Sequence, residues 1–358
     1  MRVTILGAGN SGCAHAAKLV QNGHQVVLAK TSTSMNEENF ELMQKQHGVL
    51  MHDEVSGESF FAHFEITRDV QGAIFPADVV LVLTQSLQHR ELAEKYAQYM
   101  QKGQIVIIIP GNLGSLWFAK YAPTGVIFVE GESTPYDARI MEKGNVHILF
   151  KNVRNAVAVL GNNAEKQEIL NKIDALFDCH KFLRSNVIES AMHNPNMIVH
   201  TIGTIMSASR IEMMKGEFWM YREAFSESVW NIVRQLDDEK NAVIEAYGGS
   251  SLSYLDACKW RNEEDLSQDS MTVFKEYALH GGPKGPASLN TRFVYEDIPM
   301  GLGQLEILAH ACGVHVPVTT SLITLASSLM NTDYRKITTK ESPVTNLSKQ
   351  EIINRINY

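Results

Sequence analysis

The 358-residue chain lacks three features that would each assign it to a class of protein. Its four cysteines lie far apart with no Cys-x-x-Cys pair, which argues against a zinc site or a disulfide framework and predicts a reducing, cytoplasmic location. No apolar run reaches the ~18 residues of a membrane span, and we expect no signal peptide. The 32 basic and 40 acidic residues are interspersed, so we expect neither nucleic acid nor a membrane as a partner.

A dinucleotide-binding pattern opens the chain. RVTIL predicts a strand, GAGNSG follows it directly, CAHAAKLVQNGHQ has a helical apolar face, and VVLA predicts a second strand. Gly7 would allow the tight turn, Gly9 the approach of a pyrophosphate, and Gly12 the close packing of helix on strand. The predicted cofactor site also includes Asn10, at the start of the helix whose free amides and dipole would hold the phosphates.

The acidic residue that often ends the second strand of this pattern is missing. The sequence there reads AKTSTS, with Lys30 and Thr31 and no carboxylate. A carboxylate would bond the ribose 2′-hydroxyl of NAD(H), whereas a cation and hydroxyl groups suit a 2′-phosphate. We therefore expect NADP(H) to be favoured over NAD(H). The alternative is that Lys30 is an ordinary solvated lysine.

Further strand–helix units continue to about residue 185. Apolar runs in DVVLVLTQS, QIVIIIPGNLGS, GVIFVEGES and AVAVLGNN predict strands of a doubly wound, mostly parallel sheet with both faces covered. Beyond them the apolar pattern is helical. The sequence thus predicts an α/β Rossmann domain over residues 1–185 and an all-α domain over residues 186–358 that carries the substrate and catalytic groups.

Polar residues precede the first buried helix of the second domain. In HNPN, Asn194 can cap a helix and Pro195 suits its first position, which places Asn196 and His200 four residues apart on one face. We expect TIGTIMSASRIEMM to continue this buried helix. YREAFSESVWNIVRQLDDEKNAVIEAYGG predicts another long helix, ended by glycines. On its own, His200 is better explained as a buried histidine whose hydrogen bonds are satisfied than as a catalytic residue.

A glycine- and proline-rich loop, HGGPKGPASLNTRFVYEDIPMGL, is predicted to lead into an extended segment ahead of the helix GLGQLEILAHACG. Arg292, Glu296 and Asp297 are grouped in that segment. Composition leaves two interpretations open, a functional loop and a salt-bridged structural turn.

These motifs resemble those of the NAD(P)-dependent opine dehydrogenases, the octopine and nopaline dehydrogenase group. The likeness covers nearly all of the chain and rests on ILGAGNSG, GESTPYDARI, HNPNMIVH with SRIE, QLDDEKNAVIEAYG and TRFVYEDIPMGL. The resemblance implies a reductive condensation of an amino acid with a 2-oxo acid, often pyruvate, by NADH or NADPH. It also implies that the reaction takes place between a Rossmann domain and a helical domain.

The resemblance places the family's catalytic histidine on His200, and its Arg and Asp on Arg292 and Asp297. A histidine can give and take protons near neutral pH, and Asp297 would orient its ring and favour its protonated form. Arg292 would bind a substrate carboxylate or lock Asp297 in place. The remaining predicted substrate residues are Glu132, Ser133 and Asn196. No metal is expected.

Two departures from the family pattern leave the substrates open. Thr201 stands where a proline often follows the catalytic histidine, and PGNLGS lacks a glutamine associated with the oxo acid. A ketopantoate-reductase or glycerol-3-phosphate-dehydrogenase type of reductase is the first alternative, but the equivalent helix has no lysine before Lys215. An inactive dinucleotide-binding sensor is the second. The oxo acid, the amino acid and the choice between a monomer and a homodimer stay open.

Overall fold

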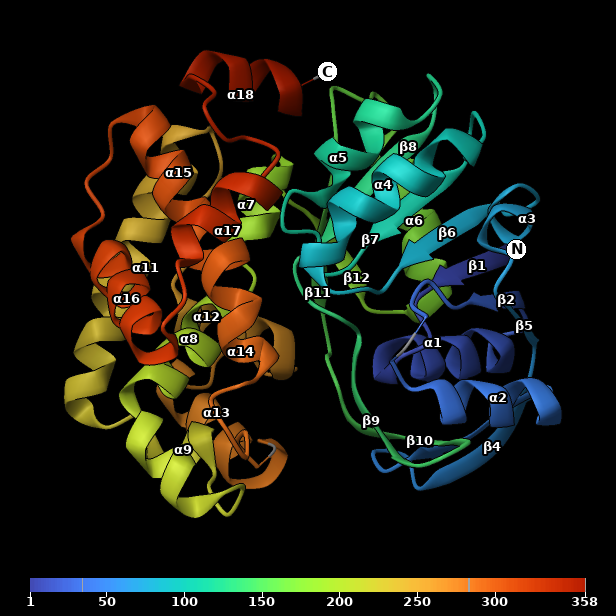
Figure 1. The fold of residues 1–358 in the computed structure, drawn as a ribbon, viewed down its shortest axis with the longest axis horizontal. Helices are drawn as coiled ribbons and strands as arrows, with labels where there is room; N and C mark the ends of the chain where they lie inside the picture. The colour runs from blue at the N-terminus through green and yellow to red at the C-terminus, as the bar shows by residue number, and fades with distance from the viewer. Residues whose placement is uncertain (34, 283, 358) are drawn as a thin grey trace. The chain divides into compact units, whose positions relative to one another are not determined.

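The chain forms two compact units, Met1–Leu183 and Arg184–Tyr358, in a computed structural model that describes residues 1–33, 35–282 and 284–357. The first unit is α/β with a mostly parallel sheet, and the described residues of the second are helical (Figure 1), which confirms the predicted fold class. In these described residues, no helix combines the length and hydropathy that a membrane span requires.

An eight-stranded sheet forms the centre of the first unit. Its strand order is β12-β11-β8-β7-β6-β1-β2-β5, and only β8 and β11 pair in antiparallel fashion. Its strands are β1 (Arg2–Leu6), β2 (Gln25–Ala29), β5 (Glu65–Thr67), β6 (Val79–Val82), β7 (Ile105–Ile108), β8 (Ile127–Gly131), β11 (Asn155–Val159) and β12 (His180–Leu183). The order reverses between β1 and β6, and this is the switch point where doubly wound sheets bind ligands.

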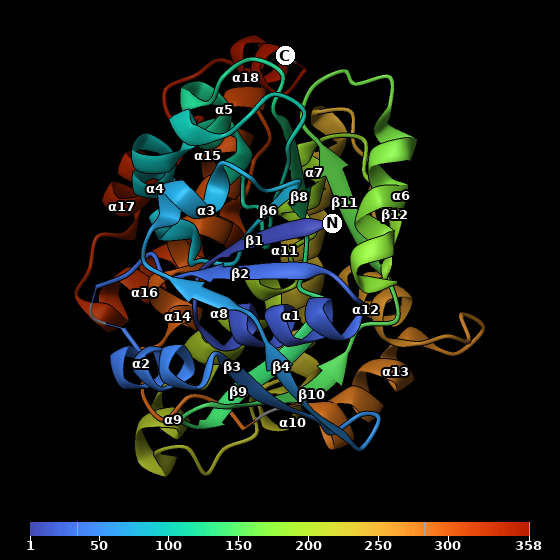
Figure 2. The ribbon, with the colours of Figure 1, turned by 90° about the vertical axis from the view of Figure 1, so that its right-hand side faces the viewer.

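Helices cover both faces of this sheet, as its continuous apolar strands predict (Figure 2). One face packs on α1 (Asn10–Gln21) and α6 (Lys166–Phe177), and the other on α3 (Val70–Ile74), α4 (His89–Tyr96) and α5 (Gly114–Tyr121). The remaining helical segments of this unit are α2 (Glu37–Gln46), η1 (Ser86–Gln88) and η2 (Ala97–Tyr99).

A second sheet of four strands was not expected from the sequence. It has the order β4-β3-β10-β9, built from β3 (Gly48–Asp53), β4 (Glu58–His63), β9 (Tyr136–Glu142) and β10 (Asn145–Lys151). Both β4 and β9 contact α1, so that the dinucleotide-binding helix lies between the two sheets (Figure 2). This packing buries α1 almost completely along its sheet-facing sides.

The second unit surrounds α8 with other helices; α8 contacts α11, α14 and α16 (Figure 1). Its helices are α7 (Val187–Met192), α8 (Asn196–Met206), α9 (Ala208–Met214), α10 (Met220–Glu223), α11 (Glu227–Ala246), α12 (Tyr254–Asn262), α13 (Ser270–Glu276), η3 (Tyr277–Gly281), α14 (Arg292–Tyr295), η4 (Ile298–Leu302), α15 (Gly303–Cys312), α16 (Pro317–Met330), α17 (Tyr334–Glu341) and α18 (Lys349–Ile356).

Three expectations for this unit need correction. The first long helix breaks at Ser207 into α8 and α9, and α9 is not buried, because Met213 is 80% exposed. The second breaks into α10 and α11. The segment expected to be extended is helical: Arg292–Tyr295 is a short α-helix and Ile298–Leu302 a π-helical turn, both packed on α8. Pro283, in the loop before it, lies outside the described residues.

Candidate active site

The glycine turn after β1 has the geometry of a phosphate-binding loop. Gly7 has a φ of +119°, and a Cβ there would lie 2.6 Å from the carbonyl oxygen of Leu83. A Cβ on Gly12 would lie 1.8 Å from the carbonyl oxygen of Gly7, whereas nothing lies within 4 Å of a Cβ on Gly9. Gly7 and Gly12 therefore make the turn possible, and Gly9 leaves the backbone open to a ligand.

The start of α1 is suited to an anion. Gly9 offers no side chain to cap it, and the first turn carries no acidic residue. The helix amides and dipole therefore favour a pyrophosphate at this end. The side chain of Asn10 has another contact, since its Oδ1 accepts a hydrogen bond from the backbone N–H of Ile140 on β9 (2.9 Å). These residues fit a dinucleotide.

Charged side chains meet at the carboxyl ends of β2 and β5. Lys30 is only 4% exposed, so it is not a solvated surface lysine; its Nζ donates to the carbonyl oxygen of Met35 and lies 3.6 Å from Glu37 Oε2. Arg68, which follows β5, donates to the same carboxylate. Burial and the charge of Arg68 lower the pKa of Lys30. Thr31, which directly follows Lys30 in the chain, is half-buried.

The end of β8 carries two buried carboxyl groups. Glu132 has no exposed surface, its backbone N–H donates to Ala156 O (3.4 Å), and Ser133 beside it is half-buried. Glu130, which sequence reasoning missed, accepts hydrogen bonds from the loop that follows β7. Burial raises the pKa of Glu130 to about 7, against the lowering effect of its hydrogen bonds to Ser115 and Leu113.

His200 and Asp297 form a buried pair in the second unit. His200 Nδ1 lies 2.7 Å from Asp297 Oδ2, and the two side chains are 10% and 4% exposed. Because a carboxylate only accepts, Nδ1 carries the proton of this hydrogen bond. The ring of Phe293 stacks on the imidazole, with centroids 3.6 Å apart and planes 15° apart. The arrangement fixes both the tautomer and the plane of the imidazole.

Arg292 contacts Glu296, whereas a substrate carboxylate and Asp297 were its two expected partners. Its Nε lies 3.4 Å from Glu296 Oε2, and its side chain is 43% exposed while that of Glu296 is 1% exposed. The guanidinium thus pairs with Glu296, and Asp297 is held by His200 instead. Arg292 is the first residue of α14 and Asp297 directly precedes η4, so the two residues lie in one short segment of the chain.

The polar residues ahead of α8 have structural partners. Asn194 Oδ1 accepts from the backbone N–H of Asn196 (3.0 Å). The helix begins one residue later than expected, with Pro195 rather than Asn194 at its N-cap. Asn196 itself is half-buried. His193 is buried at the end of α7, and its Nε2 lies 3.1 Å from the carbonyl oxygen of Ser250. Burial and the charges of Lys240 and Arg184 lower the pKa of His193 well below its usual value, which keeps this histidine neutral.

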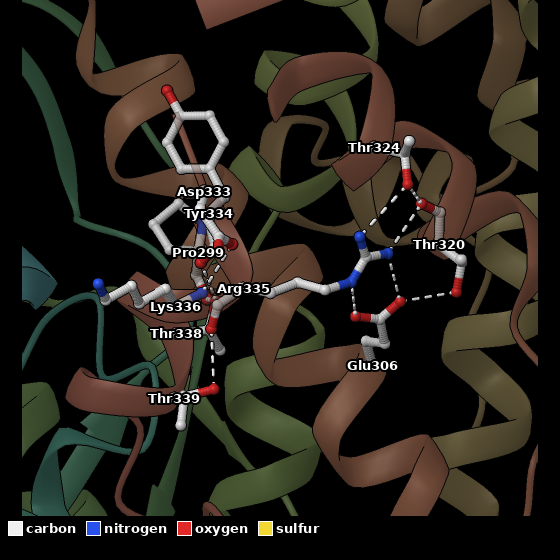
Figure 3. Close-up of polar contacts among 10 residues, drawn as sticks. All are labelled: Pro299, Glu306, Thr320, Thr324, Asp333, Tyr334, Arg335, Lys336, Thr338 and Thr339. Atoms are coloured by element: carbon white, nitrogen blue, oxygen red, sulfur yellow. Dashed lines mark hydrogen bonds and ion pairs between the residues drawn. The ribbon is translucent and has the colours of Figure 1, made fainter. Parts of the chain in front are cut away.

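A polar network joins α15, α16 and α17 and reaches Pro299 in η4 (Figure 3). Arg335 on α17 binds Glu306 on α15 through two hydrogen bonds, Nε to Oε2 (2.7 Å) and Nη2 to Oε1 (2.9 Å). Thr338, also on α17, donates to the carbonyl oxygen of Pro299 in η4 (3.1 Å). The network therefore fixes α17 to α15, and α17 in turn contacts η4.

The sequence signals for these residues differ in strength. Phe293 stands inside the motif around Arg292, but nothing in the sequence relates its ring to His200. Arg68 and Glu37 gave no signal, because Arg68 meets Lys30 through the pairing of β2 with β5, and Glu37 does so through the packing of α2 on β5. In the described residues, no three His, Cys, Asp or Glu side chains form a group that could hold a metal ion.

Two family models match the chain. Residues 183–330 match the model for the alpha-helical domain of NAD/NADP octopine/nopaline dehydrogenase. Residues 3–128 match the model for ketopantoate reductase PanE/ApbA. The first match contains His200, Asp297 and Arg292, and the second contains the glycine turn.

Whole proteins of known activity are similar over nearly the full length. An opine dehydrogenase from Arthrobacter sp. (strain 1C) is 29% identical over 345 residues, which cover 93% of this chain and 91% of that protein. A structure of octopine dehydrogenase with NADH and agmatine has a TM-score of 0.78 at 18% identity, covering 99% of this chain and 98% of that one. NADP⁺-bound yersinopine dehydrogenase has a TM-score of 0.72 at 11% identity, covering 100% and 98%. These structural likenesses show the fold.

Proposed function

Because the chain belongs to the NAD(P)-dependent opine dehydrogenase family, we propose that it reductively condenses the amino group of an amino acid with a 2-oxo acid. It is an oxidoreductase that acts on a CH–NH bond. Bound NAD(P)H supplies the hydride that reduces the imine of the two substrates. The observation that carries the proposal is the buried His200–Asp297 pair.

The pair supplies the proton transfers of this reaction. Formation of the imine from an amine and a carbonyl group expels water, which requires a proton on the departing oxygen. Since Nδ1 of His200 is bound to Asp297, Nε2 is the nitrogen that exchanges the proton with the substrate. The carboxylate of Asp297 favours the protonated imidazole, and it returns the ring to the same tautomer after each transfer.

Substrate binding is assigned to four further residues. Arg292 offers a planar, partly exposed guanidinium to a substrate carboxylate, while Glu296 holds it in position. Glu132 and Ser133 lie directly after β8, at the sheet edge where ligands bind in this fold. Asn196 is four residues before His200 on the same helix face.

We propose NADP(H) as the favoured cofactor. Two observations support this: Lys30 and Arg68 bring two positive charges to the ends of β2 and β5, and Thr31 adds a hydroxyl group there. One observation opposes it, because Glu37 pairs with both cations and would repel a 2′-phosphate unless it moves. The preference for NADP(H) therefore depends on whether the 2′-position of the bound ribose lies closer to the two cations or to the carboxylate of Glu37.

The proposed location is a reducing cytoplasm, supported by four free thiols of which three are buried. Burial raises the pKa of Cys13 and Cys179 to about 12, so neither is a reactive thiolate. A homodimer stays a prediction that sedimentation velocity can test.

The test is oxidation of NADPH and of NADH, followed by absorbance, with a panel of 2-oxo acids and amino acids offered singly and in pairs. Turnover only when both substrates are present is expected. Turnover with an oxo acid alone would instead make the protein a simple 2-oxo-acid reductase of the ketopantoate-reductase kind. Cofactor binding without any turnover would favour the sensor.

A further inference from the structure

The loop between β7 and α5 is held in an unusual backbone conformation. Asn112 and Leu113 are consecutive and both have positive φ, +47° and +65°. This left-handed region disfavours residues with a Cβ, and leucine has no polar side-chain atom that could compensate by bonding its own backbone. Such backbone strain persists only where the surroundings impose it, and it is concentrated at functional sites.

Glu130 imposes this conformation. Its Oε2 accepts from the backbone N–H of Leu113 (3.0 Å), and its Oε1 accepts from both the backbone N–H (2.9 Å) and the hydroxyl (2.5 Å) of Ser115. The carboxyl group has no exposed surface. Gly111 allows the close approach, since a Cβ there would lie 2.4 Å from Glu130 Cβ. Three donors of one loop therefore converge on one buried carboxyl group.

The loop lies at the edge of the sheet where ligands bind. It follows the carboxyl end of β7, and Asn112 Nδ2 donates to Ser86 Oγ (2.7 Å) in the segment after β6. β6 is the neighbour of β1 at the switch point of the sheet. The loop therefore contacts the segment after β6, the strand that lies between β7 and β1 in the sheet.

Glu130 also makes the starts of α1 and α5, the two helices that begin at this edge, differ in their ability to bind an anion. The start of α1 carries no carboxylate, whereas Glu130 already binds the amides at the start of α5. An anionic ligand group is therefore directed to α1 and excluded from α5.

We propose that Glu130 is a positioning residue for the cofactor: it holds Asn112 and Leu113 in the left-handed conformation, so that residues 110–115 form one wall of the dinucleotide site. Glu130 acts through this loop. The inference rests on the proposed function only in that the first unit binds NAD(P)H.

The experiment measures the Kd of NADPH and NADH by fluorescence titration of the full chain, which needs no turnover. Glu130→Gln places an amide N–H opposite a backbone N–H, so we expect the Kd of the better cofactor to rise about tenfold. Glu239→Gln is the matched control. Glu239 is also buried and accepts hydrogen bonds from two backbone amides, those of Val318 and Thr319, and from the hydroxyl of Thr319, but it lies in the second unit. The Kd of this variant should stay within about twofold of wild type.

A second variant tests whether backbone conformation is the cause. Leu113→Gly removes the preference against positive φ. Combined with Glu130→Gln it should restore much of the lost affinity, although thermal stability falls because a buried side chain is lost. A Glu130→Gln Kd within twofold of wild type, or no recovery in the double variant, would overturn the proposal. If Glu130→Gln does not fold, Ser115→Ala replaces it, with an expected rise of about threefold. A wild-type protein that binds neither cofactor would overturn the proposed function itself.

Discussion

His200 Nδ1 and Asp297 Oδ2 are 2.7 Å apart although the two residues are 97 positions apart in the chain. The contact exists because the turn around α14 and η4 packs on α8. Both side chains are nearly buried, so the hydrogen bond forms in a medium of low dielectric and its loss is costly. This pair is the centre of the chemistry that we propose.

Replacement of either residue should therefore abolish most of the turnover. We expect His200→Ala to lower kcat by ~10²–10⁴-fold because the proton donor is lost. Asp297→Asn should lower kcat by a similar factor, since an amide can donate to Nδ1 and stabilise the wrong tautomer. The Kd of NAD(P)H serves as the control and should be unchanged. Full activity of either variant would remove the pair from the mechanism.

Phe293 should influence the pH dependence of the rate. Its ring lies 3.6 Å from that of His200 and nearly parallel to it, and an aromatic face stabilises a cation by ~0.5–1 kcal/mol. Phe293→Leu keeps an apolar side chain but lacks that face. The pH at which the reductive rate falls should therefore move down by about half a unit. Phe293→Tyr retains the face and should keep the wild-type profile; an unshifted profile for Phe293→Leu would leave the ring a purely steric role.

Two opposite substitutions test the choice of cofactor. Arg68→Gln removes the more exposed cation, so the ratio of kcat/KM for NADPH to that for NADH should fall about tenfold. Glu37→Gln removes the carboxylate between the cations, so the same ratio should rise. Lys172→Gln, an exposed cation on α6, is the control and should leave the ratio unchanged. If Arg68→Gln lowers kcat/KM by the same factor for NADPH and for NADH, the guanidinium does not contact the 2′-phosphate.

The Glu306–Arg335 pair should contribute to stability rather than to chemistry (Figure 3). Arg335→Met should lower the free energy of unfolding by ~1–2 kcal/mol, a bidentate value discounted because the arginine side chain is 42% exposed. The bonds to Arg335 and Thr320 outweigh the effect of burial and lower the pKa of Glu306. The contribution is therefore present at neutral pH and lost as pH falls. Urea unfolding measures it, with Lys336→Met as the exposed control.

The sequence predicts those elements whose signals are local. Continuous apolar runs identified the strands of the large sheet, and the glycine spacing identified the turn at Gly7. The second sheet was missed because β3 and β10 pair in parallel across about 95 residues, and half-exposed strands such as β4 give a weak pattern. The glycine- and proline-rich loop was expected to lead into an extended segment, but burial against α8 and α17 stabilises a π-helical turn there.

The same difference between local and long-range signals applies to the residues of the site. The resemblance to the family placed His200, Arg292 and Asp297, and the structure joins the first to the third. The resemblance could not show that Arg292 pairs with Glu296, because both pairings are possible within one turn of helix. Nor could it find Glu130, which reads as part of an apolar strand and acquires its role only when the loop after β7 folds onto it.

Glu130 should leave a signature in the dependence of stability on pH. Burial raises its pKa to about 7, so the folded protein binds a proton more tightly there than the unfolded chain does. The stability that this group contributes is present below its ordinary pKa and is lost as pH rises through about 7. The difference in unfolding free energy between wild type and Glu130→Gln should therefore fall as pH rises from the ordinary pKa of a glutamate to about 7, and it should be constant above that pH. His89, the neighbouring buried histidine, has a pKa lowered to about 4 by burial and does not titrate there. Chemical denaturation from pH 5 to 9 provides the measurement, and a difference independent of pH would mean that Glu130 ionises as it does in the unfolded chain.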